Sequence, residues 1–419
     1  MGMAQMGKGM TGSAFGGVTM KYLKRIMILS IATALLLSAL AGLTGCRTGL
    51  PAEGETERPF VSPYDEEKNT CLAHRFADNV CQQCGAVYAP SEGLAYILSE
   101  VGEGESAYFV SGMGDCKDTQ LMIPATHEGL PVLGIYPRAF IEGKTLTYVH
   151  LPEGATTIGE WAFQGCSKLR RVEIPSTVQH IGREAFEDCL RLTEAVIPEG
   201  ITALNEGTFQ SCVNLTAVTL PTTLTEIHSS AFKGCRSLTE ITIPTGVQMI
   251  DSHAFANCDG LIAVNYNGSM KDWCGIDFGL VLANPVAVAG HLYIQGQLIE
   301  GVLTLPDGVV DVTRNALEGL VDITAVVFPE SVENTGSFQG CVNLEYLLFK
   351  GSPIYTGDTY SFENTGLTHV YLSDTKEDAI KYIPYLAAAC KAVEAQWYYA
   401  DAWEYDDSGV PQLKPTNDP

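Results

Sequence analysis

Phenylalanine recurs every 23 residues through the middle of this chain, at Phe140, Phe163, Phe186, Phe209, Phe232 and Phe255. A cysteine follows each of the last five at +3, and a proline precedes the same five by 11 residues. A period of this length indicates one short supersecondary unit copied many times, each copy burying its apolar side only against its neighbours. We therefore predict one solenoid of stacked coils rather than several globular domains.

The chain is strongly acidic, which limits its partners. Its formal charge is −24, and 46% of its 419 residues are hydrophobic, enough for a continuous core. Residues 1–45 hold four basic residues and no acidic ones, so the remainder carries −28. Such a surface repels phosphate backbones and anionic lipid headgroups. We expect no nucleic-acid partner and no direct docking on a membrane surface.

The N-terminus has the features of an export signal. Basic residues at 21, 24 and 25 precede an apolar run that ends in Leu43-Thr44-Gly45-Cys46. A positive flank, a short apolar stretch and small residues at its end are typical of such signals. The final tetrad resembles a bacterial lipobox, which implies that Cys46 is acylated and anchors the protein on the extracellular face of the cell membrane. Plain secretion and a retained transmembrane anchor are the alternatives.

Residues 46–70 are rich in proline and glutamate and are predicted to be a flexible tether. A knot of soft metal ligands follows at 71–89, with the spacing Cys71-x2-His74-x6-Cys81-x2-Cys84. Two close pairs of such ligands suit a tetrahedral structural zinc with no open position for catalysis. Two disulfides or free thiols remain an alternative in an exported segment. A redox pair made of Cys81 and Cys84 is a third.

One copy of the repeat, residues 169–192, shows how a coil is expected to fold. The segment Val172-Glu173-Ile174 alternates as a short strand does, and Pro175 ends it. On the return path that follows, apolar side chains are expected to point into the core. Gly182 then permits a turn, and residues 185–189 form a single helical turn. Successive strands would line up as one parallel sheet. The cysteines would form a column of buried thiols, with disulfides between coils as the alternative.

The copies IPSTVQHIGREAFEDCLRL, LPTTLTEIHSSAFKGCRSL and IPTGVQMIDSHAFANCDGL resemble the BspA-type leucine-rich repeats of bacterial surface proteins. The resemblance covers about residues 121–372, with breaks. It implies an α/β-type leucine-rich repeat stack that has a parallel β-sheet on one face and short helical or 3-10 turns. Members of that family are typically exported or attached to the surface, and several are implicated in adhesion to host or bacterial surfaces.

Both ends of such a stack expose apolar core and need caps. We expect a β cap at 90–125, the solenoid at 126–372 and a helical cap with an acidic aromatic tail at 373–419. The solenoid would carry an insertion around residues 127–129 and an enlarged coil at about 267–300. Pro384 would kink the C-terminal cap. The aromatic tail is expected to pack on the cap, with contact to a partner as the alternative.

The outward residues of the strands form columns that suit binding, because the face they make is mixed and rich in hydroxyl groups. Tyr148, His150, Arg170 and Arg171 form the strongest candidate cluster, because aromatic and arginine side chains dominate interface energetics. Exposed strands also favour threonine for purely structural reasons. The full candidate face is Tyr148, His150, Arg170, Arg171, Glu173, Glu194, Thr216, Thr219, Glu240 and Thr242.

The sequence points to a non-enzymatic surface lipoprotein. Paired carboxylates, a nucleophile placed with a histidine and an orienting acid, and a phosphate-binding glycine loop were all sought, and none is recognisable. No catalytic residue is predicted, and the only cofactor expected is the structural zinc. We predict a monomeric module for protein binding or adhesion, with a protein of a host or bacterial surface as partner. A glycan-binding module is the alternative, and a thiol redox protein using Cys81 and Cys84 is a weaker one.

Overall fold

The computed structural model describes residues 76–77, 80–81, 89–102, 104–280, 282–352, 362–379, 395–400, 402–405 and 411–414. The chain divides into two units, Met1–Tyr88 and Ala89–Pro419. In the first unit, β1 (Phe76–Ala77) and β2 (Val80–Cys81) pair antiparallel. Cys46, Cys71, His74 and Cys84 lie outside the described residues, as do the tether and the side chain of Cys81. The lipidation and zinc predictions therefore stay predictions.

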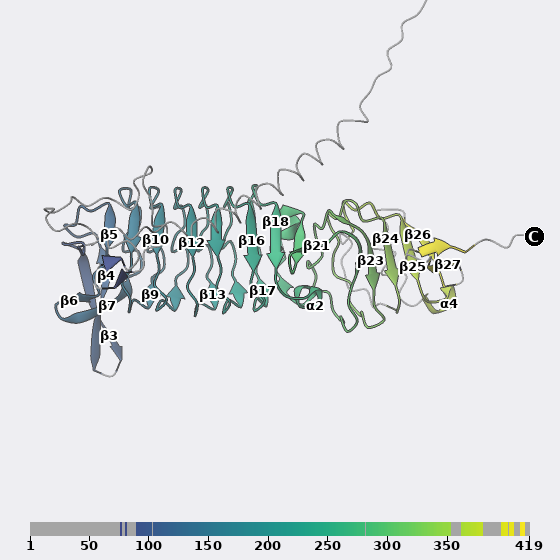
Figure 1. Cartoon of the computed structure of the whole chain (residues 1–419), viewed down its shortest axis with the longest axis horizontal. Helices are drawn as coiled ribbons and strands as arrows, with labels where there is room; N and C mark the ends of the chain where they lie inside the picture. The colour runs from purple at the N-terminus through teal and green to yellow at the C-terminus, as the bar shows by residue number, and fades with distance from the viewer. Residues whose placement is uncertain are drawn as a thin grey trace, which may run out of the picture. The chain divides into compact units, whose positions relative to one another are not determined.

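The second unit is a stack of coils, and the predicted strands form a parallel ladder along it (Figure 1). In this first ladder, Arg171 lies beside Tyr148 and Ala217 beside Glu194, which is the 23-residue register of the repeat. Between these pairs the backbone N–H of Thr193 donates to the carbonyl of Arg170 at 3.3 Å. The strands of the first ladder are β8 (Tyr148–His150), β10 (Arg171–Glu173), β12 (Glu194–Val196), β14 (Ala217–Thr219), β16 (Glu240–Ile243) and β18 (Ala263–Tyr266).

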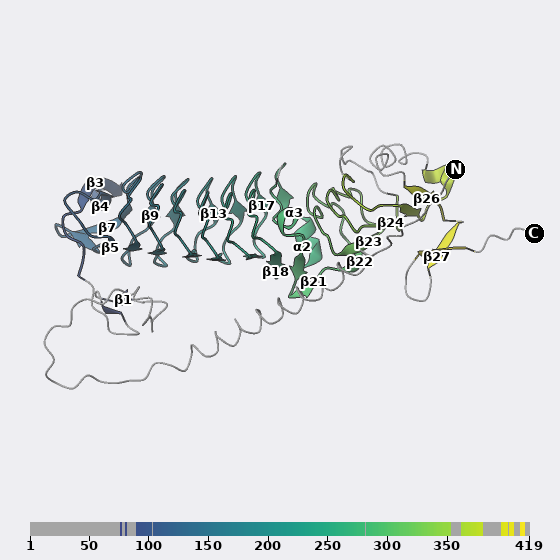
Figure 2. The ribbon, with the colours of Figure 1, turned by 90° about the horizontal axis from the view of Figure 1, so that it is seen from above.

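A second parallel ladder runs along another side of the coils, where the sequence analysis expected only a return path (Figures 1 and 2). Its register is again 23 residues, with Ile181 beside Ile158. Strands of two residues are too short to show the alternation by which strands are recognised. The strands of the second ladder are β9 (Thr157–Ile158), β11 (His180–Ile181), β13 (Ala203–Leu204), β15 (Glu226–Ile227), β17 (Met249–Ile250) and β19 (Asp277–Phe278).

The periodic phenylalanines form a stack through the core, as the period predicts. Consecutive rings from Phe140 to Phe255 lie 5.3–5.7 Å apart between centroids and within 18° of parallel. The turn after each ring is closed by a hydrogen bond between residues three apart, such as Cys189 N–H to the Phe186 carbonyl at 3.2 Å. The cysteines that follow the rings are buried and free. The predicted column of unpaired thiols is thus present.

The N-terminal end of the stack carries the expected β cap. The strands β3 (Ala95–Gly102) and β4 (Glu105–Gly112) form an antiparallel pair, and β4 joins the second ladder through β7 (Leu130–Ile135). The insertion around 127–129 is a hairpin between β6 (Thr126–His127) and β7. Its turn holds Glu128 and Gly129 at φ 49° and 81°. The strand β5 (Gln120–Met122) begins the first ladder by pairing with β8.

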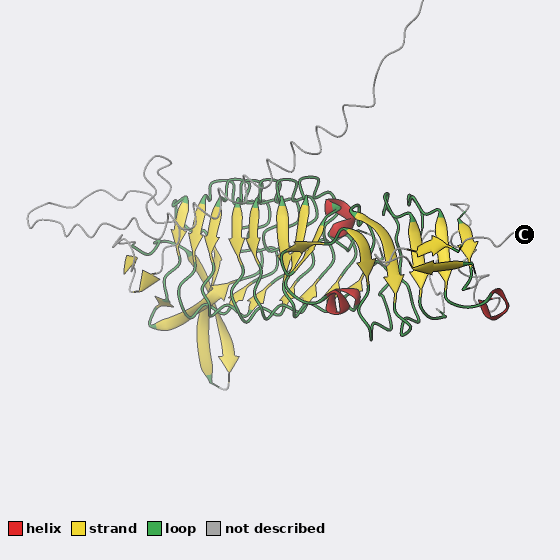
Figure 3. Ribbon diagram, turned by 45° about the vertical axis from the view of Figure 1, so that its right-hand side comes forward, coloured by secondary structure: helices red, strands yellow, loops and turns green. Residues whose placement is uncertain are grey.

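The enlarged coil contains two of the helices, shown in red in Figure 3. The capping box of Ser269 and Asp272 begins α2 (Met270–Cys274), and a left-handed Gly290 ends α3 (Val286–Ala289). Buried Trp273 donates its indole N–H to the carbonyl of Ala316 at 2.8 Å, which fastens this coil to the next. The strand β20 (Leu292–Ile294) continues the first ladder, and β21 (Gln297–Leu298) folds back on it.

The sheet continues beyond residue 372, where the sequence analysis ended the solenoid. Its last strand is β26 (Gln396–Tyr398), which pairs parallel with β25 (His369–Leu372). Within the expected helical cap the structure describes one helix, α4 (Lys376–Ala379), and Pro384 lies outside the described residues. The C-terminal strands are β22 (Gly301–Thr304), β23 (Ile323–Phe328), β24 (Tyr346–Phe349), β25 (His369–Leu372) and β26, followed by an antiparallel pair, β27 (Trp403–Tyr405) and β28 (Pro411–Leu413).

The aromatic tail packs against the outer side of this C-terminal sheet. Trp403 is buried with Val327, Leu348 and Tyr371 in a cluster separate from the main core. Its ring lies 5.4 Å from that of Tyr371, and its indole N–H donates to the carbonyl of Leu372 at 3.0 Å. Trp403 therefore packs against the rest of the chain, as one of the two interpretations of the tail predicts. It packs on the C-terminal sheet and not on a helical cap.

Candidate binding surface

The first ladder turns alternate side chains outward, and this surface is the one proposed from the sequence. In β16, Ile241 and Ile243 are buried while Glu240 and Thr242 are exposed. Because the coils are in register, each outward position continues from strand to strand as a column. The columns therefore form as the 23-residue spacing predicts, although their side chains are not equally accessible.

Tyr148 is an error in the predicted cluster, because its side chain is buried at 1% exposure. It sits in the middle strand of the sheet β10-β8-β5, between Gln120 and Arg171 in register. Long side chains thus flank the ring on both sides. By spacing alone this position is equivalent to Ala217 and Glu240 in later coils, which are exposed. Tyr148 contributes to packing and offers a partner almost no surface.

Two charged members of the cluster, His150 and Arg171, are paired with glutamates of the wider candidate face. The Nδ1 atom of His150 lies 3.1 Å from Oε2 of Glu173. Arg171 lies 3.1 Å from Oε1 of Glu194 and 3.5 Å from Oε1 of Glu173. The side chains of His150, Arg171 and Glu173 are only 12–17% exposed. Such a network of partly buried charges fixes the coils in register, and a partner that recruited one member would have to break existing ion pairs.

Further along the first ladder the outward face is open. Val196 is 61% exposed, which is unusual for a valine in the middle of a ladder. The hydroxyl of Thr216 is directed to the preceding coil, where it donates to the carbonyl of Thr193 at 2.9 Å. We define the open strip as the six exposed outward residues of β12, β14 and β16, namely Glu194, Val196, Ala217, Thr219, Glu240 and Thr242.

A second cluster, which the sequence analysis missed, lies at the turn before the phenylalanine. The guanidinium groups of Arg138 and Arg183 lie 4.6 Å and 4.7 Å from the ring of Trp161, within the range of cation–π contacts. The indole N–H of Trp161 donates to Glu184 at 2.9 Å. Arg183 also lies 3.6 Å from Glu206, in a polar groove of about 410 Å³ that continues to later coils. Trp161 and Arg138 stand two residues before their phenylalanines, so alignment of that position would have revealed the pair.

Burial disfavours ionisation of the thiols in the cysteine column at neutral pH. Burial raises the pKa of Cys166 and of Cys258 to about 12 and that of Cys212 well above its ordinary value. A thiol acts as a nucleophile or metal ligand only as the thiolate. In the part of the chain that the structure describes, no group of histidine, cysteine or acidic residues could hold a metal ion. None of the helices described there is long and apolar enough to cross a membrane.

Comparison with known proteins agrees with the coil structure. The family described as BspA type leucine rich repeat region matches residues 134–262 and 300–385, just over half of the chain, in 6 copies. The crystal structure of the T. pallidum leucine rich repeat protein TpLRR is similar at 28% identity, covering 42% of this chain and 85% of that one, with a TM-score of 0.38. A search among curated proteins found no match.

Two further solved structures cover more of the chain. A leucine rich cell surface protein from Faecalibacterium prausnitzii is 22% identical over 74% of this chain and 94% of its own, with a TM-score of 0.38. The pneumococcal vaccine antigen PcpA is 13% identical over 74% of this chain and 98% of its own, with a TM-score of 0.37. The family assignment rests on the match to the repeat and on the 23-residue register of the coils. The chain belongs to the BspA-type leucine-rich repeat family.

Proposed function

We propose that this protein is a non-enzymatic module of the cell surface that binds another protein through the open strip. The exposure of six outward side chains in register over three strands carries this proposal. A flat, mixed face with an exposed valine at its edge has the composition of a protein–protein interface. Backbone groups inside the ladder are already paired, so the strip offers side chains as contacts and does not require refolding.

A glycan remains the alternative partner, since the hydroxyl groups of Thr219 and Thr242 can hydrogen-bond to sugars. None of the six strip residues lines the polar groove near Arg183 or the pocket beside α3, which favours a protein, because small ligands are held in concave sites that bury most of their surface. The protein would act as a monomer. Its acidity further favours a partner with a basic surface, because complementary charge accelerates association.

Capture on the immobilised soluble body, residues 47–419, tests this function. Surface proteins of host cells and of bacteria are applied in one arm, and a glycan array is probed in the other. Replacing Thr219 and Thr242 by arginine should abolish protein capture, because two long cations then occupy the strip. The same substitution at Thr202, an exposed residue beside the second ladder, is the control and should leave capture unchanged. An equal loss of protein capture in both variants would show that the open strip is not the binding surface. Binding to the glycan array alone would favour a glycan as the partner.

Attachment to the membrane through Cys46 is proposed as well, with residues 46–70 as the tether. The lipobox-like tetrad supports the anchor, and the similarity to a leucine rich cell surface protein of F. prausnitzii supports the location. Labelling cells with palmitate and isolating the protein tests the anchor. Cys46→Ser should lose the label and release the protein from the membrane fraction. Retention of the label in this variant would contradict acylation at Cys46.

For the knot at 71–89 we propose a structural zinc held by Cys71, His74, Cys81 and Cys84. The spacing of the four ligands supports it, and disulfides and a redox pair are the alternatives. Metal analysis of purified protein should give one zinc per chain, with thiols in this segment that do not react. The double variant Cys81→Ser, Cys84→Ser should lose the metal. Metal-free protein with reversible disulfide turnover would instead establish the redox alternative.

A further inference from the structure

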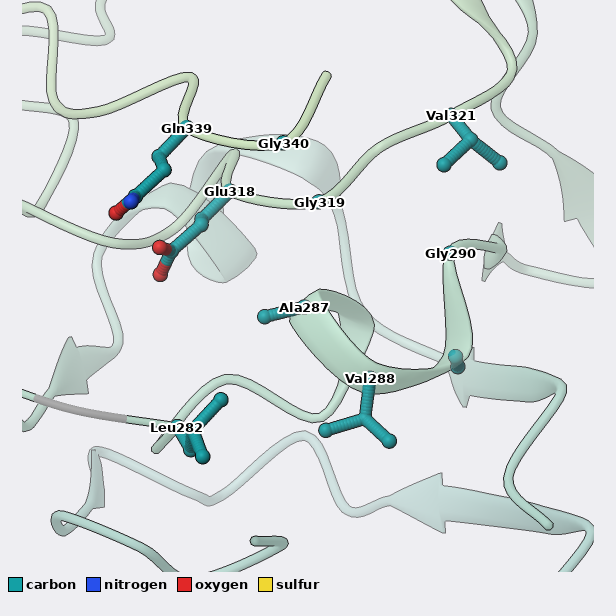
Figure 4. Close-up of a pocket in the computed structure, with 10 residues that line it drawn as sticks. Leu282, Ala287, Val288, Gly290, Glu318, Gly319, Val321, Gln339 and Gly340 are labelled. Carbon is teal, nitrogen blue, oxygen red and sulfur yellow. The ribbon is translucent and has the colours of Figure 1, made fainter. Parts of the chain in front are cut away.

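A pocket of about 350 Å³ lies between α3 and the turns of the following coils (Figure 4). One wall comes from the enlarged coil, through Leu282 and the helical residues Ala287 and Val288. The opposite wall comes from two later turns, through Glu318 and Gln339 with the glycines that follow them. The side chains of Leu282, Ala287 and Glu318 extend towards the same space in Figure 4. The floor is therefore apolar, and the rim carries a carboxylate and an amide.

Backbone contacts hold these two walls in place. A Cβ atom at Gly319 would lie 2.5 Å from Cα of Ala287, so only glycine allows this turn to approach α3 so closely. The N–H of Gly319 donates to the carbonyl of Gln339 at 2.9 Å, and the N–H of Val321 donates to the carbonyl of Gly290 at 3.1 Å. These contacts thus fix the backbone frame of the pocket, and side chains such as Leu282, Glu318 and Gln339 line it.

The surface beside the pocket is unusually apolar. Leu282, which lines the pocket, is 40% exposed, and Leu280, two residues earlier in the chain, is 71% exposed. Exposed leucines that adjoin a preformed pocket are characteristic of surfaces that meet a partner. The enlarged coil interrupts the 23-residue period, so neither α3 nor this leucine pair exists in the regular coils. Insertions in a repeat array are commonly where binding residues are placed.

We propose that this pocket receives one bulky apolar side chain of a protein partner, with a basic residue next to it in the partner's sequence. The volume is at the lower end of the range for ligand pockets, so it suits one aromatic side chain better than a larger ligand. The rim carboxylate of Glu318 and the net charge of −24 favour a neighbouring lysine or arginine. The inference rests on the proposed protein-binding function and adds an anchoring site to it.

The dipeptide Ac-Phe-Lys-NH2 is a direct probe of the pocket. Protein with labelled leucine and valine methyl groups is titrated with it, and methyl NMR shifts are followed. The methyl groups of Leu282, Val288 and Val321 should shift in a saturable manner. Ac-Phe-Glu-NH2 should bind roughly threefold more weakly because it places a carboxylate near the rim. Ac-Gly-Lys-NH2 should cause no shift. An absence of saturable shifts with Ac-Phe-Lys-NH2, or equal binding of the glycine peptide, would overturn the proposal.

Matched leucine variants complete the test. Leu282→Ser should weaken Ac-Phe-Lys-NH2 binding by about tenfold, since it removes an apolar wall. Leu190→Ser is the control, because Leu190 is 39% exposed but lies outside the pocket, and it should leave binding unchanged. Ala287→Phe should block binding by filling the space, and thermal melting verifies that each variant is folded. Equal effects of the Leu282 and Leu190 changes would contradict the assignment. A chain that captures proteins but does not bind the dipeptide refutes the pocket alone, whereas dipeptide binding without any protein capture refutes the proposed function.

Discussion

The thiol of Cys212 donates a hydrogen bond to the backbone carbonyl of Phe186 in the preceding coil, at 3.1 Å. Each of the other four column cysteines makes the same bond to the coil before it, at 3.1–3.3 Å. The cysteine column therefore has a polar role in addition to its packing. It gives a buried carbonyl a second hydrogen bond, since the Phe186 carbonyl also accepts from the backbone N–H of Cys189 at 3.2 Å.

Loss of this bond should be measurable. Cys212→Ala is expected to lower the free energy of unfolding by about 1–2 kcal/mol, since it leaves a small cavity and removes one of the two hydrogen bonds to the Phe186 carbonyl. Cys274→Ala is a suitable control, because Cys274 is equally buried and the structure shows no hydrogen bond from its sulfur within the described residues. Denaturant unfolding compares the two. Equal losses would mean that the sulfur only fills space.

The column also predicts instability in alkali. In the native state burial holds the pKa of Cys166 and Cys258 at about 12, compared with an ordinary value near 9.0. The thiols can ionise only in the unfolded chain between these limits, so their contribution to stability is complete below pH 9 and declines as pH rises towards 12. Between pH 9 and pH 12, each thiol should lower the free energy of unfolding by about 1.4 kcal/mol for every pH unit.

Melting temperatures between pH 7 and pH 11 measure this decline. The double variant Cys189→Ala, Cys235→Ala should be less stable at pH 7 yet lose stability less steeply above pH 9. Burial raises the pKa values of both thiols well above the ordinary value. The double variant therefore lacks two of the groups whose ionisation in the unfolded chain lowers stability in alkali. An unchanged slope in the variant would show that other groups, such as the tyrosines, cause the alkaline loss.

Two glycines of the coils have different physical roles, and alanine substitution should separate them. Gly182 approaches the preceding coil so closely that a Cβ atom would lie 2.4 Å from the backbone nitrogen of Glu160. Gly182→Ala should cost about 3 kcal/mol or more, because backbone must move. Gly165 has φ 72°, and a Cβ atom there would make only van der Waals contact, with its nearest neighbour, Cγ of Glu142, at 3.4 Å. Gly165→Ala should cost only about 1 kcal/mol of left-handed strain. Thermal unfolding ranks the two, and the reverse order would contradict the close approach of the coils.

Threonine hydroxyls tie the turns after the prolines to the next coil. The hydroxyl of Thr223 accepts from the N–H of Gly200 at 3.0 Å and donates to the carbonyl of Ile201 at 2.8 Å. Thr177 makes the equivalent pair with residues 154 and 155. Thr223→Val keeps the shape but removes both bonds, and should cost about 1–2 kcal/mol in denaturant unfolding. Thr239→Val, at an exposed ladder position, should change stability by less than about 0.5 kcal/mol.

Much of the fold could be predicted from the sequence, because several residues at fixed spacing mark each coil of the repeat. The spacing of Phe163 and Cys166 places both in the core, and Val172 in a strand, without knowledge of any contact. The second ladder could not be predicted, since a strand such as His180–Ile181 is too short to alternate. The left-handed turn residues, such as Trp161 at φ 55°, were also missed, because residues of every type occupy that position.

The candidate site was only partly predictable, for a similar reason. Spacing places a residue in an outward column but does not show what covers it. Tyr148 and Thr219 are both outward positions of the first ladder, yet one is buried beside Arg171 and the other is open. Ion pairs between coils, such as Arg171 with Glu194, depend on side-chain length and rotamer, which the repeat pattern does not contain. The pocket beside α3 lies between the enlarged coil, which departs from the pattern, and the turns that follow it.

Photo-crosslinking on living cells tests the proposed binding strip most directly. A benzophenone amino acid is placed at Thr219, in the open strip, or at Thr202, beside the second ladder. Irradiation should give a discrete adduct with a protein partner from position 219 and none from position 202. An adduct from position 202 alone, or equal adducts from both positions, would contradict the assignment of binding to the first ladder.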